Sequence, residues 1–435
     1  MDKKYVKFCV ISAVTLLLTS CAEQSEETAA GQLVLDQDQV VAGIHDRVMT
    51  LDTHVDIHQD MSFEPKYDPG TLTGQQVDLI KMEEGGLDSA FFIVYMGQTE
   101  RNQAGYAEAK QIATRKFDAI HKMTEMYPNQ IEFAYTPQQA REIYASGKKV
   151  AMIGVENGYA IGKDLTLIKK YYDRGARYMT LAHNGHNDIC DSAQPQTRLG
   201  DAEEEHGGVS EFGYQVIDEM NRVGMMVDIS HVSEKCMMQA TAYSKIPPIA
   251  SHSGVHALAG HVRNMTDEQM IALKEAGGVM QVVAFSDYVK FYPEAGAAQA
   301  ALMQEVAKSF GDEQFDFKKH YDTAEFREAR ERYMEQFPPA TVAQFVDQAR
   351  AGGSAAPVIY LTPRGAPLGQ RGGQVCAGWA GEHVVAGQAG QQNLVRTNVP
   401  RLGQVGGMDR RRRQREVGLV SPDAAPARKR LDGHT

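Results

Sequence analysis

The chain has 435 residues, enough for one large domain or two of medium size. Hydrophobic residues make up 43% and charged residues 23%, which is ordinary for a soluble globular protein. With 45 Lys and Arg against 56 Asp and Glu, the formal net charge of −11 argues against a general nucleic-acid-binding protein. The cysteines form neither a metal-binding spacing nor an evident disulfide framework; they are Cys9, Cys21, Cys190, Cys236 and Cys376.

The N-terminus has the pattern of an export signal. Residues 2–7 include three lysines, and residues 8–18 form an apolar stretch too short to span a bilayer comfortably. The following LTSC resembles the bacterial lipoprotein box, so residues 1–21 are predicted to be a lipoprotein-type signal peptide, with Cys21 as the lipidated first residue of the mature protein. Ordinary export with a coincidental cysteine is the alternative. Residues 22–40 are polar and acidic, and we expect a flexible tether.

This signal also predicts a location. Ala22, rather than Asp, follows Cys21, and in such lipoproteins this goes with sorting to the outer membrane. We therefore expect an exported protein of the bacterial cell envelope, held by its lipid on the periplasmic side of the outer membrane. The membrane is thus an expected partner through the lipid anchor, and nucleic acid is not.

Downstream of the tether, apolar segments of strand length alternate with amphipathic segments of helix length. The predicted strands are 48–53, 87–96, 150–154, 176–182, 224–230, 248–251 and 278–285. The predicted helices are 74–84, 104–127, 165–174, 210–223, 233–244 and 266–276. Strict alternation predicts a parallel sheet covered by helices, and seven such strands favour a barrel over an open sheet. We predict an α/β fold, a (β/α)8 TIM-type barrel over residues 41–348.

Residues with metal-binding side chains lie at the C-terminal ends of these strands. They are His54, Asp56, Glu156, His183, His231 and His252. In a parallel barrel these ends meet at one mouth, where catalytic sites lie. In the first of these strands Asp52, His54 and Asp56 alternate and so share a face, which is costly to bury unless a cation lies between them. A hydrogen-bonded strand end is the alternative for this stretch alone.

The donor set suits a pair of divalent metal ions. Three imidazoles come from His54, His231 and His252, and two carboxylates come from Asp56 and Glu156. Five protein ligands exceed the three of a typical catalytic zinc, but they suit two metals about 3.5–4 Å apart that share a carboxylate. Such a pair holds a bridging water, lowers its pKa and polarises a carbonyl, so metal-assisted hydrolysis is the predicted reaction class.

Several segments, in the right order, resemble the membrane dipeptidases, also called renal dipeptidase-like metallopeptidases. They are DTHVD (52–56), GVENG (154–158), RYMTLAHN (177–184), GMMVDISHVS (224–233) and ASHSGVHALAGHVRNMTDE (250–268). The resemblance covers residues 51–285. It implies a (β/α)8 barrel with two zinc ions per chain that cleaves dipeptides.

Carried over to this sequence, the resemblance implies that His54 and Asp56 hold one zinc. It implies that His231 and His252 hold the other, and that Glu156 bridges the two. A hydroxide bridging the metals would attack the peptide carbonyl.

The resemblance also implies two residues that contact the substrate. His183 would stabilise the carbonyl oxygen as it becomes tetrahedral, and Arg263 would bind the free carboxylate of the dipeptide, which its planar fork suits. Without the motifs, a loop hydrogen bond for His183 and a surface salt bridge for Arg263 would be the simpler interpretations. Residues that could orient the ligands are Asp52, His58, His186, Asp188 and Asp228.

The resemblance ends near residue 348. A family member would continue with an eighth strand, an acidic motif of the SDFDG type that protonates the leaving amine, and a closing helix, and none of these motifs follows here. Residues 351–435 hold twelve Lys and Arg against five Asp and Glu, a charge of +7, whereas residues 1–350 carry −18. We expect the eighth strand and closing helix to be missing or replaced. Residues 349–435 would be an atypical Gly- and Arg-rich tail, disordered or read in a shifted frame.

Within this tail, the short apolar runs 356–362 and 383–386 could supply a substitute strand. The run MDRRRRQR (408–415) fits a disordered charged segment better than a patch for nucleic acid or anionic lipid.

Three functions follow from these observations. The first is a di-zinc dipeptidase. The second is a catalytically impaired or inactive metal-binding envelope lipoprotein, because the C-terminal acid motif is absent. The third is a related amide or lactone hydrolase. A homodimer is compatible with the sequence, which leaves the side-chain preference for dipeptides open.

Overall fold

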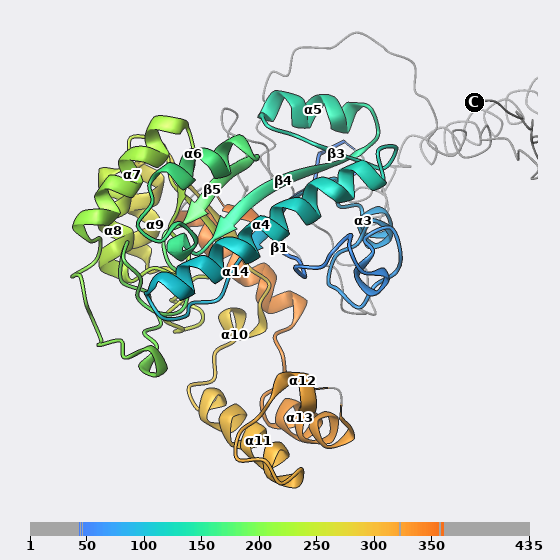
Figure 1. Cartoon of the computed structure of the whole chain (residues 1–435), viewed down its shortest axis with the longest axis vertical. Helices are drawn as coiled ribbons and strands as arrows, with labels where there is room; N and C mark the ends of the chain where they lie inside the picture. Colours follow the sequence, from blue (N-terminus) through green and yellow to red (C-terminus); the bar gives the residue numbers. More distant parts are fainter. Residues whose placement is uncertain (1–42, 44, 46, 322, 356–357, 361–435) are drawn as a thin grey trace, which may run out of the picture. The chain divides into compact units, whose positions relative to one another are not determined.

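The structure is a computed structural model (Figure 1), and it describes residues 43, 45, 47–321, 323–355 and 358–360. All of these belong to the first of two compact units, Met1–Ala386; the second unit, Gly387–Thr435, lies outside the described residues. The predicted signal peptide, Cys21, the tether and most of the predicted tail also lie outside them. In the described part of the chain, no helix has both the length and the apolar character needed to cross a membrane.

A parallel β-sheet forms the centre of the fold. Its strands lie in the order β1 (Leu51–Asp56), β2 (Ser89–Tyr95), β4 (Lys149–Glu156), β5 (Ala176–Thr180), β6 (Met226–Asp228), β7 (Ile249–Ser253), β8 (Val279–Val282) and β9 (Val358–Tyr360). All pairings are parallel, and the short strand β3 (Ile131–Phe133) pairs with β4. Among the described residues no pairing joins β9 back to β1. The fold is therefore an incomplete (β/α)8 TIM-type barrel, which confirms the predicted class.

Helices separate most of the strands along the chain. They are α3 (Leu79–Gly85), α4 (Gln103–Met126), α5 (Pro137–Ala145), α6 (Thr166–Asp173), α7 (Glu211–Val223), α8 (Glu234–Tyr243) and α9 (Asp267–Glu275). Most begin at a polar side chain that accepts a hydrogen bond from the backbone N–H three residues on, as Ser210 does from Gly213 and Thr266 from Gln269. The polar residues between the apolar segments therefore fix where these helices start.

The strand β4 shows why the sheet can hold a buried site. Every residue from Val150 to Glu156 is buried, as expected for a central strand covered on both faces. Gly154 gives room to the ring of Tyr178, because a Cβ at position 154 would lie only 2.1 Å from that ring. The Tyr178 hydroxyl can then donate a hydrogen bond to the Thr53 carbonyl on β1 at 2.8 Å. A glycine in β4 thus brings a side chain of β5 against β1.

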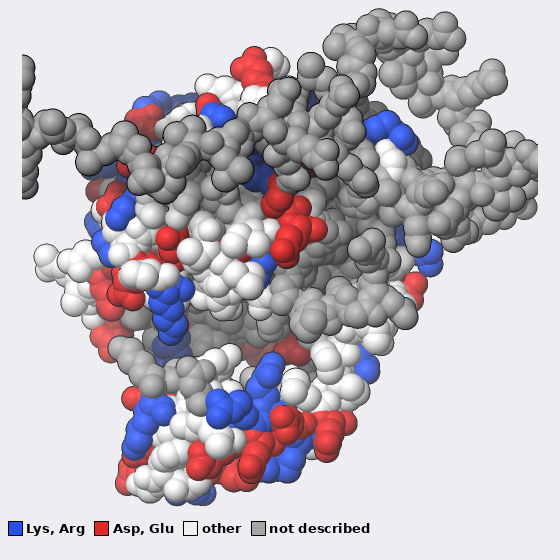
Figure 2. All heavy atoms as spheres, turned by 90° about the vertical axis from the view of Figure 1, so that its right-hand side faces the viewer, with Lys and Arg blue, Asp and Glu red and all other residues white. Residues whose placement is uncertain are grey.

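The connection from β8 to β9 adds five helices that were not predicted. They are α10 (Ser286–Val289), α11 (Ala295–Ser309), α12 (Phe317–His320), α13 (Ala324–Gln336) and α14 (Val342–Ala355). Helices α11 and α13 pack around Val306, Phe326 and Ala329, and acidic and basic side chains are mixed on their surface (Figure 2). On α14, Gln348 Oε1 accepts a hydrogen bond from the Val255 backbone N–H at 2.6 Å, which ties this helix to the segment after β7.

The eighth position of the barrel is filled by β9. Its residues Val358, Ile359 and Tyr360 pair with Met280, Gln281 and Val282 of β8. The strand falls within the apolar run 356–362, so the family's eighth strand is replaced by a segment of the predicted tail. Helix α14 continues from residue 342 to residue 355 and so crosses residue 348, where the family motifs end. Strand β3 and helix α5, which lie between α4 and β4, are also absent from the predicted elements.

Candidate metal centre

Four imidazoles surround one buried carboxylate. Glu156 is the last residue of β4 and is 3% exposed. Its Oε1 atom lies 3.2 Å from His231 Nε2, 3.3 Å from His252 Nε2 and 3.6 Å from His183 Nε2. Its Oε2 atom lies 3.4 Å from His54 Nε2. The two oxygens of Glu156 therefore face two different sets of nitrogen donors.

These side chains meet because they come from the C-terminal ends of four other strands. His54 lies in β1 and His252 in β7, whereas His183 and His231 follow the ends of β5 and β6. The backbone of His231 has a φ of +69°, in the left-handed region that a residue with a Cβ rarely adopts. Such strain persists where the surrounding structure enforces it, and it is concentrated at functional sites.

The other ring nitrogen of three of these histidines meets an oxygen. His54 Nδ1 lies 3.3 Å from the Tyr178 hydroxyl, whose proton is donated to the Thr53 carbonyl. His231 Nδ1 lies 3.1 Å from Asn184 Oδ1. Both oxygens accept, so each Nδ1 carries a proton, and Nε2 is the nitrogen through which each imidazole would bind a metal.

A third such contact involves His252, whose Nδ1 lies 2.8 Å from Ser251 Oγ. All three Nε2 atoms are therefore directed towards the Glu156 carboxylate. This arrangement is typical of a metal site, because each imidazole would bind the metal through Nε2 and is oriented by the hydrogen bond of its Nδ1.

Burial and neighbouring charges shift the pKa values of the site's side chains in different directions. Burial opposes ionisation of Glu156, but the His54 and His183 imidazoles outweigh it and hold the pKa of Glu156 well below its usual range. Burial lowers the pKa of His252 to about 4 and also lowers that of His231. Burial acts in the same sense on His54, yet the Glu156 carboxylate raises the pKa of His54 to about 9. In the metal-free protein at neutral pH, His54 is charged and the other two imidazoles are neutral.

The geometry fits a metal centre. Nε2 of His231 lies only 2.8 Å from Nε2 of His252, and both rings are neutral with their protons on Nδ1. Two nitrogen lone pairs at this distance repel one another unless a cation lies nearby. Imidazole nitrogen and carboxylate oxygen are ligands that zinc prefers. Two groups of donors lie close enough to hold an ion, one of His54, Glu156 and His252, the other of Glu156, His183 and His231.

This grouping differs from the one that the family resemblance implies. By distance, His252 belongs with His54, and His183 takes a place beside His231. Asp56, expected as a ligand beside His54, has a side chain that is 70% exposed, and its Oδ1 lies 3.9 Å from His54 Nε2. The structure thus brings His54, Glu156, His183, His231 and His252 together, with Asp56 at their solvent-facing edge.

Arg263 contacts the backbone of one of these histidines. It is 4% exposed, and its Nη2 donates a hydrogen bond to the His252 carbonyl at 3.1 Å. Its guanidinium carbon lies 5.2 Å from the ring centroid of Tyr288, on α10. Its Nε has no hydrogen-bond partner among the described residues, so a buried charged donor remains available to an anion.

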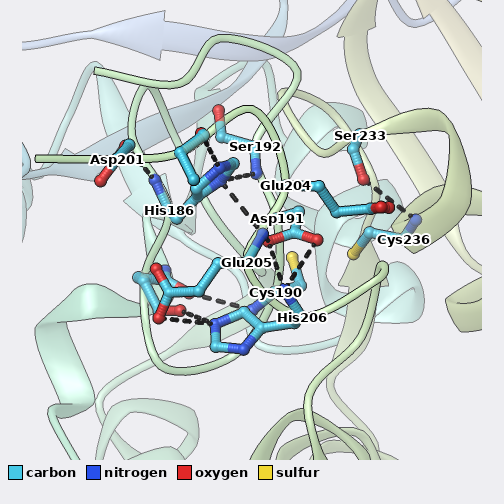
Figure 3. Close-up of polar contacts among 12 residues, drawn as sticks. His186, Cys190, Asp191, Ser192, Asp201, Glu204, Glu205, His206, Ser233 and Cys236 are labelled. Atoms are coloured by element: carbon cyan, nitrogen blue, oxygen red, sulfur yellow. Dashed lines mark hydrogen bonds and ion pairs between the residues drawn. The ribbon is translucent and has the colours of Figure 1, made fainter. Parts of the chain in front are cut away.

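The long loop after β5 fixes the backbone at two of the histidines. Asp191 accepts hydrogen bonds from the backbone N–H groups of His206 (Figure 3) and Gly208, which closes the loop on itself. The Ser192 hydroxyl then donates to the His183 carbonyl, and the backbone N–H of the next residue, Ala193, donates to the His231 carbonyl at 2.8 Å. The loop therefore holds both histidines in place.

Sequence reasoning missed the residues that orient the imidazoles. Tyr178, Asn184 and Ser251 were not among the candidates, whereas Asp228 was. A usable signal was present for two of them, since Asn184 and Ser251 are direct neighbours of His183 and His252. Tyr178 gave no such signal, because its contact with His54 depends on the space left by Gly154.

A metal-binding centre at the mouth of a (β/α)8 barrel is the class of site that this fold and these residues define. The sequence profile described as membrane dipeptidase (peptidase family M19) matches residues 38–348. The chain belongs to this family.

Individual relatives agree with this membership. The chain is 32% identical to dipeptidase tcpJ of Claviceps purpurea (strain 20.1) over 244 residues, 55% of each chain. It spans about half the length of the curated relatives it matches. The crystal structure of the probable dipeptidase PvdM from Pseudomonas aeruginosa superposes with a TM-score of 0.64 at 25% identity, covering 75% of this chain and 86% of that one.

A third comparison shows the fold alone. A metallopeptidase from Rhodobacter sphaeroides, liganded with a phosphinate mimic of the dipeptide L-Ala-D-Ala, has a TM-score of 0.52 at 18% identity. The match covers 74% of this chain and 88% of that one.

Proposed function

We propose that this protein is a metal-dependent hydrolase that cleaves dipeptides at a centre of two zinc ions. The ligands would be His54, Asp56, Glu156, His231 and His252, with Glu156 shared by both ions. One observation carries the proposal: Glu156 Oε2 faces His54, whereas Glu156 Oε1 faces His231 and His252. A carboxylate that directs each oxygen to a different set of imidazoles is suited to bridge two metals. Membership of the membrane dipeptidase family supports the same reaction.

When bound, two zinc ions supply a water of lowered pKa as the nucleophile and polarise the scissile carbonyl. The protein would supply the remaining interactions. Burial lowers the pKa of His183, so this imidazole is neutral at pH 7 and can donate an N–H to the oxygen that becomes negatively charged. Its side chain is 16% exposed and thus reachable from the mouth of the barrel.

Arg263 would bind the free carboxylate of the dipeptide. Its buried guanidinium is partly unpaired, and its neighbour His252 belongs to the metal centre. A carboxylate bound there would hold the peptide bond beside the metals, which favours dipeptides over longer chains and over amidated ones.

A second candidate function rests on the eighth strand. β9 reads VIY, and neither it nor the sequence that follows contains an acidic motif of the SDFDG type. A metal-binding envelope protein without turnover therefore competes with the dipeptidase. A related amide or lactone hydrolase is a third candidate.

One set of measurements separates these candidates. Purified protein is analysed for metal by mass spectrometry and assayed with a dipeptide and with its C-terminally amidated form. The dipeptidase predicts about two zinc ions per chain, hydrolysis of the dipeptide but not of the amide, and loss of activity with a chelator. Two ions without turnover would favour the second candidate. Equal hydrolysis of both substrates would favour the third.

We further propose that the protein is exported and anchored to the envelope through a lipid on Cys21, as the LTSC sequence suggests. Metabolic labelling with a radioactive fatty acid tests this. Label is expected on the wild-type protein and absent from Cys21→Ser. Label on both, or on neither, would contradict the anchor.

A further inference from the structure

A buried chain of hydrogen bonds leads away from one metal-binding imidazole. His252 Nδ1 lies 2.8 Å from Ser251 Oγ, and Ser251 Oγ donates a hydrogen bond to Asp228 Oδ2 at 2.7 Å. Asp228 is the last residue of β6, and the other two lie in the neighbouring strand β7. Asp228 and Ser251 have no exposed surface, so water does not compete for these contacts.

Asp228 fixes the direction in which these hydrogen bonds are donated. Its Oδ1 atom accepts the backbone N–H groups of Ser230 at 3.0 Å and Ser251 at 2.9 Å. Its Oδ2 atom accepts the hydroxyl groups of Ser251 at 2.7 Å and Thr180 at 2.5 Å. All four contacts are donated to Asp228, as expected for an ionised carboxylate that can only accept.

This direction decides which ring nitrogen of His252 carries the proton. Because the Ser251 hydroxyl gives its proton to Asp228, it offers only lone pairs to His252. Nδ1 of His252 must therefore be the N–H donor, and Nε2 keeps the lone pair that points towards Glu156 and His231.

We propose that Asp228 and Ser251 are positioning residues that set the tautomer of His252 and so prepare its Nε2 to bind metal. The inference rests on the proposed metal centre. The partners of the other imidazoles are uncharged: His54 meets the Tyr178 hydroxyl, and His231 meets the Asn184 amide. His252 is thus the one of these three whose tautomer is tied to a carboxylate through a hydroxyl.

The substitution Asp228→Asn reverses the direction in which these hydrogen bonds are donated, without changing the shape of the side chain at position 228. The amide oxygen keeps the two backbone N–H groups, because the alternative orientation would direct its NH2 against them. The NH2 then occupies the position of Oδ2 and donates to Ser251 Oγ. Ser251 now donates its own proton to His252 Nδ1, which leaves the proton of the imidazole on Nε2, where it blocks the metal. The same exchange beside a catalytic histidine in serine proteases produces the wrong tautomer.

The substitution Ser251→Ala removes the hydroxyl and leaves the tautomer free. Loss of such a partner of a metal ligand typically costs about 10- to 100-fold in metal affinity. Ser230→Ala is the matched control. The Ser230 hydroxyl accepts the backbone N–H of His252 at 3.1 Å and lies 3.4 Å from Ser251 Oγ, but it neither binds the His252 ring nor accepts the proton that Ser251 donates to Asp228.

The test measures zinc affinity by competition with a chelator and the histidine tautomers of the metal-free protein by nitrogen-15 NMR. We expect His252 protonated at Nδ1 in the wild type and in Ser230→Ala, and at Nε2 in Asp228→Asn. Zinc affinity should fall about 10- to 100-fold in Ser251→Ala and further in Asp228→Asn, and stay near wild type in Ser230→Ala. Wild-type His252 protonated at Nε2, or equal affinities in all three variants, would overturn the proposal. If wild-type His252 has the predicted tautomer but the protein binds no zinc, the proposed function is overturned instead.

Discussion

Nε2 of His231 lies 2.8 Å from Nε2 of His252, although both imidazoles are neutral and carry their protons on the opposite nitrogen. Neither nitrogen can donate a hydrogen bond to the other in this state. Glu156 Oε1, within 3.3 Å of both, adds a negative charge. The three atoms therefore form a strongly electron-rich pocket, which a divalent cation would stabilise.

The substitution His231→Ala tests this pocket. It removes one nitrogen donor, so we expect the metal content to fall from two ions per chain to about one. We also expect kcat/KM for a dipeptide to fall by more than about 100-fold, because losing only a residue that hydrogen-bonds to a ligand already costs up to about 100-fold. His121→Ala is the control, since the His121 ring bonds to the Arg174 carbonyl, away from Glu156. Unchanged metal content in His231→Ala would contradict the role of this residue.

The stability of the metal-free protein should depend on the His54–Glu156 pair. Burial disfavours charged His54, but Glu156 raises its pKa from 6.5 to about 9. A group whose pKa is raised on folding stabilises the folded protein below its unfolded pKa, and this stabilisation is lost as the pH rises through its folded pKa. His54→Gln should therefore lower the free energy of unfolding by about 3 kcal/mol at pH 6 and by little above pH 9.

Denaturant unfolding of the metal-free wild type and of His54→Gln at pH 6 and at pH 9.5 measures this difference. His58→Gln serves as the control, because His58 is partly exposed and pairs with Asp60 rather than Glu156. A His54→Gln effect that is the same at both pH values would show that the ion pair contributes nothing.

Arg263 should determine the preference for a free carboxylate. Hydrogen bonds to charged groups contribute about 1.5–3 kcal/mol, so Arg263→Lys should lower kcat/KM for a dipeptide about 10- to 100-fold, mainly through KM. Its activity on the C-terminally amidated dipeptide should stay at the low wild-type level. Steady-state kinetics with both substrates measure this. An equal loss on both substrates would place Arg263 in the scaffold of the site rather than in substrate binding.

The strands and their polar ends could be predicted because both depend on local patterns. Buried parallel strands give continuous apolar runs, as in β4, and the barrel brings their C-terminal ends together whatever the sequence between them. The orientation of His54 could not be predicted in this way. The contact of Tyr178 with His54 depends on Gly154, in a third strand. The proximity of His183 to His231 depends on a loop held together by Asp191.

The eighth strand illustrates a second limit. The departure from the family motifs after residue 348 is evident in the sequence, and the run 356–362 is apolar enough to suggest a strand. Its place in the sheet, however, depends on pairing with β8, whose partner residues lie 78 positions earlier in the chain. Local propensity contains no information about such a partner.

The replacement strand should contribute to stability. A chain ending after residue 355 lacks β9 and leaves one edge of β8 unpaired, while its other edge stays paired with β7; a chain ending after residue 360 retains both pairings. At about 1 kcal/mol for each net hydrogen bond, we expect the shorter chain to be less stable by about 2–3 kcal/mol and to aggregate more readily. Thermal unfolding and light scattering of the two chains measure this. Equal stability would show that the pairing of β9 with β8 does not stabilise the fold.

The most direct measurement of the central claim is a titration of the metal-free protein with zinc while dipeptide hydrolysis is followed. If Glu156 bridges two ions that together perform the reaction, activity should be absent without metal and should reach its maximum at two zinc ions per chain. Hydrolysis that persists in a chelator, or two bound ions without any hydrolysis, would contradict the account.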